Sequence, residues 1–304
     1  MTDDRKPGSA IDNNLSRQSV SYGRTIQLEV NLRKDSAMKN SVTATFSTLL
    51  VLAVAFPVFA GRHDSALRDA QKEIDDLEKK AARHLVAEGA AGTLPWKEYV
   101  ANPDAKGEAS LVVVLGGKDS AIGGRREPEP AAGLVPLLDW SRTKWKGGKV
   151  VVLVPLLQKT PMGGGRGGAG GGMSASGADR IPALVRDRAK ENGVASTRVF
   201  ATGFSMGGEA IWGLLSSDPT LFVRAALVGA GGDASRLGDV RAEVLALHGE
   251  SDGTVPLALA KALVDAVNER HPGRATLTTL RGKDHRESAE AAYGRRETWD
   301  WLVQ

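Results

Sequence analysis

The chain has 304 residues, 41% of them hydrophobic, which is enough for one large α/β domain or two small ones. Lys and Arg outnumber Asp and Glu by 40 to 36. Residues 1–60 account for half of that surplus, and no basic stripe with interleaved aromatics favours nucleic-acid binding. The absence of Cys excludes disulfides, thiolate catalysis, Cys-ligated metals and lipid anchoring through a Cys.

The N-terminal 60 residues divide into two segments. Residues 1–37 are polar, mixed in charge and without a sustained apolar period, which predicts disorder. Residues 38–60 have a short basic start, an apolar run and small residues before Gly61, the three parts of a secretory signal peptide. The apolar run of about 15 residues is shorter than the roughly 20 that span a membrane.

This pattern favours Met38 as the functional start, with residues 1–37 a misassigned upstream extension. We expect a secreted or periplasmic protein after cleavage near Ala60. The alternative is a signal anchor, in which residues 42–60 stay in the membrane and residues 1–37 form a cytoplasmic tail.

Residues 61–92 follow a helical pattern. Apolar residues recur at three- and four-residue steps between His63 and Glu88, with charges on the other faces, and glycines end the segment. The pattern predicts an amphipathic helix that packs on the domain. A dimerising coiled coil over residues 63–88 is the alternative, although three heptads are barely enough for one.

Apolar runs and helical patterns alternate through residues 93–304. Residues 93–103 predict an edge strand with Pro-bounded ends. The other predicted strands are residues 111–115, 150–154, 199–202, 225–228, 244–247 and 275–280, and the predicted helices are residues 133–145, 181–191, 209–215, 257–269 and 288–302. Continuous Val/Leu runs suit strands that are buried on both faces, so we expect an α/β fold: a mostly parallel sheet covered by helices on both faces.

Functional residues of such a sheet lie at the carboxyl ends of its strands. There the sequence has a G-x-S-x-G motif, Gly203-Phe-Ser205-Met-Gly207, between a predicted strand and a predicted helix. That order is typical of a nucleophile elbow, in which Ser205 is held in a strained turn and the helix N-terminus points at the site. A plain glycine-rich turn is the alternative in a chain with 36 Gly.

A nucleophilic serine needs a base, and the His follows the acid in this chain order. His285 comes after the last predicted strand through a short loop and is the best placed base. His271 lies at the opposite end of the sheet as a surface turn residue, and His248 ends a strand, where it would serve packing or loop support.

The orienting acid is expected in the loop after residues 244–247. Asp252 lies there, five residues past the strand, and is preferred over Glu250 and Asp284. Asp284 adjoins His285 in sequence, and neighbouring side chains in such a loop rarely face each other. Ser205, Asp252 and His285 are thus separated by about one strand–helix unit each, which lets them converge along one rim.

The oxyanion hole requires two backbone N–H groups. One is expected from Met206, and the other from Lys118, with Gly117 as the alternative, in the loop after residues 111–115. The glycine-rich segment 163–172 lies on the same side and could form a flap, and Lys118 and Arg166 would then favour an anionic group on the substrate.

Three segments, residues 203–208, 248–256 and 282–285, together resemble the α/β-hydrolase superfamily. The resemblance spans about residues 93–304. It is strongest to compact esterases: the phospholipase/carboxylesterase, dienelactone-hydrolase-like and polyhydroxybutyrate-depolymerase or feruloyl-esterase-like proteins. The family usually has His-Gly where this chain has Gly116-Gly117, which leaves the second oxyanion donor open.

The resemblance implies a serine hydrolase that cleaves small-molecule or polymer-end esters without a metal or organic cofactor. Only about 14 residues separate Val228 from Val244, so no large lid domain fits there. Two alternatives remain: a prolyl-oligopeptidase-like serine peptidase, and a catalytically silent binding protein that keeps the hydrolase fold.

Overall fold

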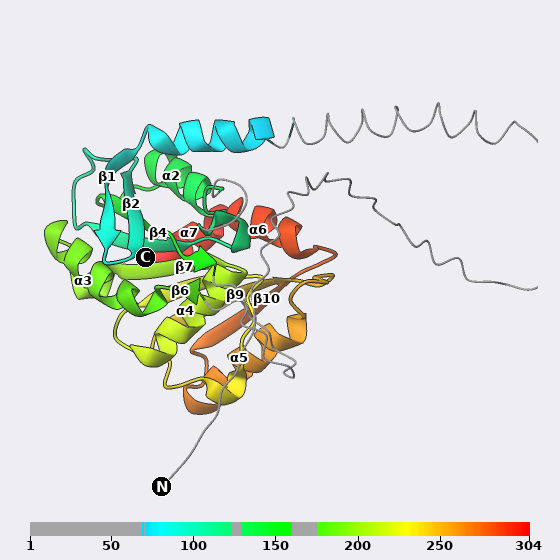
Figure 1. Ribbon diagram of the computed structural model, residues 1–304. Coiled ribbons are helices and arrows are strands. Elements are labelled where there is room, and N and C mark those ends of the chain that lie inside the picture. Colours follow the sequence, from blue (N-terminus) through cyan, green and yellow to red (C-terminus); the bar gives the residue numbers. More distant parts are fainter. Residues whose placement is uncertain (1–68, 70, 123–128, 160–174) are drawn as a thin grey trace, which may run out of the picture. The chain divides into compact units, whose positions relative to one another are not determined.

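The computed structural model describes residues 69, 71–122, 129–159 and 175–304 (Figure 1). The predicted upstream extension, the predicted signal peptide and the glycine-rich segment with Arg166 lie outside these residues. Within the described ranges, none of the helices combines the length and the apolar character that crossing a membrane requires.

One sheet of eight strands organises the domain, in the order β1-β2-β4-β3-β7-β8-β9-β10. The strands β3, β4 and β7 to β10 pair in parallel, whereas β1 and β2 are antiparallel to their neighbours. The predicted mostly parallel sheet is therefore confirmed. The bounds are β1 (Leu85–Ala91), β2 (Leu94–Val100), β3 (Ser110–Leu115), β4 (Val150–Pro155), β7 (Val199–Phe204), β8 (Arg224–Val228), β9 (Glu243–Gly249) and β10 (Ala275–Leu280), and β5 (Gln158–Lys159) pairs separately with β6 (Ala175–Ser176).

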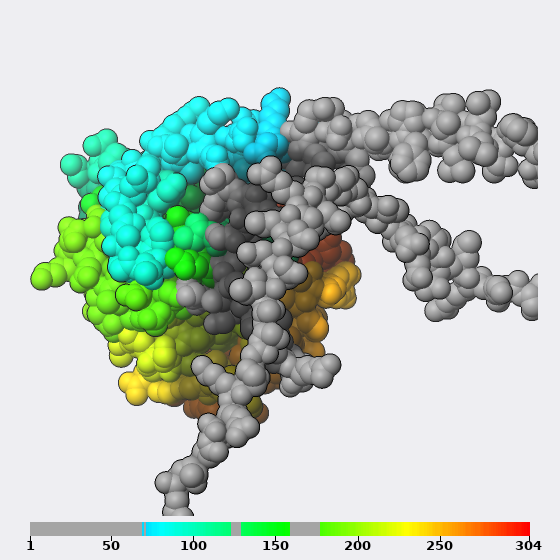
Figure 2. All heavy atoms as spheres, viewed as in Figure 1, coloured from blue at the N-terminus to red at the C-terminus, as the bar shows by residue number. Residues whose placement is uncertain are grey.

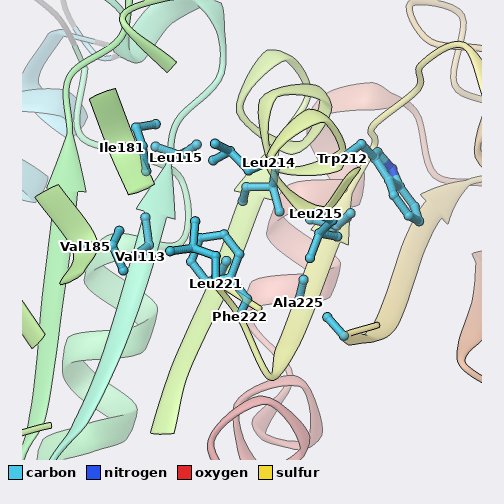
Figure 3. Packing of buried hydrophobic residues seen from close by; sticks show 14 of the residues in the cluster. Val113, Leu115, Ile181, Val185, Trp212, Leu214, Leu215, Leu221, Phe222 and Ala225 are labelled. Carbon is cyan, nitrogen blue, oxygen red and sulfur yellow. The ribbon is translucent and has the colours of Figure 1, made fainter. Parts of the chain in front are cut away.

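Helices cover both faces of the sheet because successive residues of the buried strands point to opposite sides. In β3, Val113 and Leu115 face the layer of α3 and α4 (Figure 3), whereas Val112 and Val114 face the layer of α2, α6 and α7. The bounds are α2 (Leu134–Thr143), α3 (Ile181–Glu191), α4 (Met206–Ser217), α5 (Leu257–Arg270), α6 (His285–Tyr293) and α7 (Arg296–Val303), with short 3₁₀ turns η1 (Lys118–Ser120), η2 (Ala178–Arg180), η3 (Ser196–Arg198) and η4 (Ala234–Arg236).

The first helix is shorter than predicted. Its described part covers residues 71–82, and Leu77 and Ala81 pack its apolar stripe on the domain. The prediction that the helix continues to Glu88 is wrong, because Leu85–Ala91 form β1 and pair with β2. The predicted edge strand is consequently the second strand of the sheet, and β1 is the true edge, on the molecular surface in Figure 2.

The predicted helix over residues 288–302 is two helices. A capping box between Asp284 and Glu287 starts α6 at His285. The helix ends at Tyr293, where Thr298 and Trp299 donate their side-chain hydrogens to the free carbonyls of Ala292 and Tyr293, at 2.7 and 2.9 Å. The chain therefore turns before α7. The connection from β8 to β9, residues 229–242, contains only η4, so no lid domain is inserted there.

Candidate active site

The G-x-S-x-G motif forms a sharp turn between β7 and α4. Ser205 has φ 53° and ψ −121°, and among the described residues it alone has positive φ without being a glycine. Its N–H donates to the Val228 carbonyl of the neighbouring strand at 2.9 Å, which anchors the strained residue. A serine held in this sparsely populated conformation is the elbow geometry that the motif predicted.

Two glycines make the turn sterically feasible. A Cβ on Gly203 would lie 2.6 Å from the backbone of Gly207, and a Cβ on Gly207 would lie 2.1 Å from the Leu115 carbonyl oxygen. Both distances are far below van der Waals contact, so no side chain fits at either position. The second contact also places the end of β3 directly against the elbow.

Ser205, His285 and Asp252 form one line of hydrogen bonds. Ser205 Oγ lies 2.9 Å from His285 Nε2, and His285 Nδ1 lies 2.8 Å from Asp252 Oδ2. The three residues come from the carboxyl ends of β7, β9 and β10, as expected. The arrangement matches the hydrogen-bond pattern through which a base activates a serine and a carboxylate orients the base.

The Asp252 carboxylate is completely buried and fully provided with donors. Its side chain has no exposed surface, and its Oδ1 accepts the backbone N–H groups of Thr254 at 2.9 Å and Val255 at 2.8 Å. Oδ2 takes His285, and His248 Nε2 lies 3.3 Å from the same oxygen. Hydrogen bonds to the ionised form stabilise a buried carboxylate that water cannot reach.

The loops that carry Asp252 and His285 are joined by backbone hydrogen bonds. Glu250 N–H donates to Leu280 O and Ser251 N–H to Lys283 O, both at 3.0 Å. A Cβ on Gly249 would lie 2.3 Å from Lys283 O, so the close approach depends on that glycine. The distance between the acid and the base is thereby fixed by backbone, not only by their side chains.

The competing residues have other contacts. Asp284 caps α6 by accepting the Glu287 N–H, and Glu250 accepts the Gly282 N–H at 2.9 Å. His271 pairs with Asp239 at 2.5 Å on the surface. Among the described residues, the side chains of Asp284, Glu250 and His271 make no hydrogen bond to Ser205, His285 or Asp252.

Phe204 is a neighbour of the base that the sequence analysis did not single out. Its ring lies 4.7 Å, centroid to centroid, from the His285 imidazole. Gly229, with φ 54°, leaves room for this pair, since a Cβ there would lie 3.2 Å from the Phe204 ring and 3.3 Å from His285 Nδ1. Phe204 occupies a position of the G-x-S-x-G motif that any residue can fill, so the sequence gives no signal of this contact. The contact depends on where β8 ends.

Tyr293 contacts β7, the strand that leads into Ser205, through Thr202. Thr202 Oγ1 donates to the Ala226 carbonyl at 2.7 Å and lies 3.1 Å from the Tyr293 hydroxyl. Burial raises the pKa of Tyr293 well above its ordinary value, so its phenol stays neutral. The ring also stacks on Trp299, which ties α6 and α7 to β7.

The expected oxyanion donors lie around the elbow. Met206 is the first residue of α4, where the backbone N–H has no partner within the helix. Gly117 is buried against the Phe204 ring, with an added Cβ 3.1 Å from it, and Lys118 opens η1 and is exposed. The loop after β3 thus lies beside the turn that carries Ser205.

A cavity of about 730 Å³ lies beside this loop. Gly116 and Ser120 line it on one side and helix residues such as Ile74 on another, but Ser205, Asp252 and His285 do not. The cavity therefore flanks the hydrogen-bonded residues without enclosing them. In the part of the chain that the structure describes, no group of three His, Asp or Glu side chains could hold a metal ion.

Sequence comparison gives no match, either to a protein-family model or to a curated protein. Comparison of structures does. The chain is similar to a thermostable esterase, with 21% identity and a TM-score of 0.58 over 73% of this chain and 63% of that one, less than two thirds of its length. It also matches esterase 2 of Thermogutta terrifontis in a tabun-modified form (17% identity, TM-score 0.49, 72% and 96% of the chains). An α-β serine hydrolase homologue from Coxiella burnetii matches at 12% identity and TM-score 0.49, over 71% and 96%. Together with the strand order and the elbow, the first likeness identifies the architecture: the chain has the α/β-hydrolase fold.

Proposed function

We propose that the protein is a serine hydrolase that cleaves carboxylic esters through an acyl-enzyme intermediate. The observation that carries the proposal is the continuous hydrogen-bonded line Ser205–His285–Asp252, whose first member is held in a strained turn. A strained backbone at a serine costs stability, whereas a serine hydroxyl held against an imidazole can be activated as a nucleophile. The similar thermostable esterase supports the reaction class.

In the acylation step, Ser205 Oγ attacks the ester carbonyl carbon while His285 Nε2 takes the hydroxyl proton. The carbonyl π electrons move to its oxygen and form a tetrahedral oxyanion. Collapse of this intermediate breaks the bond to the alcohol oxygen, and His285 Nε2–H protonates that leaving group. In deacylation a water molecule repeats the attack, and Ser205 leaves with its proton restored.

Asp252 and the backbone N–H groups around the elbow stabilise the imidazolium and the oxyanion that form during the reaction. Asp252 keeps the proton of His285 on Nδ1, so that Nε2 faces Ser205 as an acceptor, and it stabilises the imidazolium. The N–H groups of Met206 and of Lys118 or Gly117 would stabilise the oxyanion. Losing one such donor typically costs about 10²–10³-fold in rate.

A fluorophosphonate probe tests the proposal directly. We expect covalent labelling of the wild-type protein, none of Ser205→Ala, and wild-type labelling of Ser251→Ala, which removes an exposed serine from the neighbouring Asp252 loop. Peptide mass spectrometry should place the adduct on Ser205. An unlabelled wild-type protein would refute the enzyme assignment and favour the silent binding protein.

A substrate panel then separates esterase from peptidase. We expect turnover of short-chain p-nitrophenyl esters and little turnover of peptide amides, because p-nitrophenolate leaves the tetrahedral intermediate far more readily than an amide nitrogen does. Hydrolysis of amides without esters would replace the esterase by the prolyl-oligopeptidase-like alternative.

We also propose that the protein acts outside the cytoplasm after cleavage near Ala60. The support is the signal-peptide pattern of residues 38–60 in the sequence. Mass spectrometry of the N-terminus of the exported protein should give a start at Gly61. A start at Thr2 with the apolar run intact would favour the signal anchor instead.

A further inference from the structure

The Asp252 carboxylate lies between two imidazoles, and only one of them reaches Ser205. We propose that the second, His248, is a positioning residue for ester hydrolysis: it fixes the Asp252 carboxylate and, through it, the ring of His285. This inference rests on the proposed function. It goes beyond the loop support that the sequence predicted for His248, because it gives the residue an effect on the reaction rate.

His248 holds the turn that carries Asp252. Its Nε2 lies 2.8 Å from Val255 O and 3.3 Å from Asp252 Oδ2. The N–H of the same Val255 donates to Asp252 Oδ1 at 2.8 Å. His248 therefore holds Val255 by its carbonyl oxygen, and the N–H of the same residue holds Oδ1, while the His248 ring lies against Oδ2.

The proton of His248 can be placed from its partners. A backbone carbonyl only accepts, so His248 Nε2 must carry hydrogen to bond Val255 O. Asp252 Oδ2 lies 3.3 Å from the same nitrogen, beside that hydrogen bond. Oδ2 thus receives the hydrogen of His285, and Oδ1 receives those of Thr254 and Val255.

The burial of the pair explains why a protein donor matters here. The side chains of His248 and Asp252 are 1% and 0% exposed, so water has no access to replace a missing hydrogen bond. Without the hydrogen bond from His248, the Val255 backbone would shift, the carboxylate that its N–H holds would turn, and His285 would follow because Oδ2 holds its Nδ1. Since a small misplacement of a reacting group is costly, fixing Asp252 should appear in kcat.

His248 cannot act by touching the substrate. It belongs to β9, in register with Thr279 of β10, and its side chain is 1% exposed. Its Nε2 contacts Val255 O and Asp252 Oδ2, whereas the partner of Ser205 Oγ is His285. Its influence must pass through Asp252, which separates a positioning role from a catalytic one.

The test compares two substitutions of His248. His248→Gln keeps an N–H donor, and we expect kcat for p-nitrophenyl acetate near that of wild type. His248→Phe keeps the ring and removes the donor, and we expect kcat to fall roughly ten- to hundredfold with KM little changed. The rate of fluorophosphonate labelling should fall in parallel with kcat, since both depend on His285 activating Ser205.

The control is Asn268→Ala, which removes two hydrogen bonds to the Ala275 backbone away from Asp252. We expect it to lower the urea midpoint and leave kcat unchanged. If His248→Phe does not fold, His248→Met replaces it, because Met fills irregular space without a strong donor. If neither folds, near-wild-type turnover by His248→Gln supports the role, and turnover as low as that of Ser205→Ala overturns it.

A folded His248→Phe or Met variant with wild-type kcat would refute the positioning role. So would a loss of kcat shared equally by Asn268→Ala, because the effect would then follow from stability. A wild-type protein that is not labelled at Ser205 overturns the proposed function and this inference together. Labelled wild type with an unaffected apolar variant overturns the inference alone.

Discussion

Replacing Asp252 by Asn removes one charge with almost no change in shape, and the structure predicts which way the amide will turn. The wild-type carboxylate accepts two backbone N–H groups at Oδ1 and faces two imidazoles at Oδ2. An amide has one acceptor and one donor end, so it cannot satisfy both sides.

The two orientations differ in cost. With its NH₂ toward Thr254 and Val255, the amide would oppose the backbone N–H groups of both residues, which donate to Oδ1 in the wild-type protein. With its NH₂ toward the imidazoles, His285 can accept at Nδ1 by changing tautomer, and His248 keeps its bond to Val255 O. The second orientation loses fewer hydrogen bonds and should dominate.

In that orientation His285 carries its hydrogen on Nε2 and points it at Ser205 Oγ, so it cannot act as a base. We expect kcat for p-nitrophenyl esters to fall about 10⁴-fold. The free energy of unfolding should fall by only about 1–3 kcal/mol, the cost of one poorly matched buried group. Initial rates and urea unfolding measure the two effects separately.

Asp284→Asn is the matched control, because it changes the carboxylate adjacent to His285 in sequence. Asp284 is the N-cap of α6, and Asn caps helices as well as Asp does. We expect both rate and stability to stay close to those of wild type. An Asp252→Asn variant within tenfold of wild-type activity, or an Asp284→Asn variant with the larger loss, would refute the assignment of Asp252.

Two further predictions concern packing. Gly207→Ala should abolish labelling of Ser205, because its Cβ would lie 2.1 Å from Leu115 O. Gly213→Ala on the same helix has open space around its Cβ, and its free energy of unfolding in urea should rise by about 0.5–1 kcal/mol. Equal stability of the two variants would contradict the steric argument. Glu98→Ala removes the buried carboxylate that bonds the Arg188 guanidinium at 2.8 Å, and since Arg188 keeps its pair with Glu191 the change should cost about 1.5–3 kcal/mol with kcat unchanged. A folded Glu98→Ala variant with reduced kcat would connect this ion pair to the site.

The sequence predicted the interior strands because burial on both faces leaves a visible pattern. Every residue of β3 and β4 is buried, and residues 111–115 and 150–154 within them are unbroken apolar runs. Strand β1 is different, since most of its residues are exposed and it lies at the edge of the sheet. Its sequence therefore shows neither an apolar run nor an alternation, and the helical pattern before it extends by accident into Leu85.

Chain order made the positions of Asp252 and His285 predictable. Each follows its own strand of a parallel sheet, and the carboxyl ends of parallel strands meet at one edge. The contact between Phe204 and His285 has no such rule behind it, because it depends on the ring orientation and on the space left by Gly229. The second oxyanion donor is unpredictable for the same reason, since it depends on the direction of single N–H bonds.

His248 illustrates both sides of this division. Its place at the end of β9, four residues before Asp252, is visible in the sequence and suggested support for the loop. What the sequence could not give is that the chain turns back between His248 and Val255, so that Val255 offers its N–H to the carboxylate and its carbonyl to His248. A residue one strand position earlier would point to the other face of the sheet. A histidine at that earlier position would be an ordinary buried histidine. The role proposed for His248 therefore follows from the geometry of the turn and not from the sequence motif.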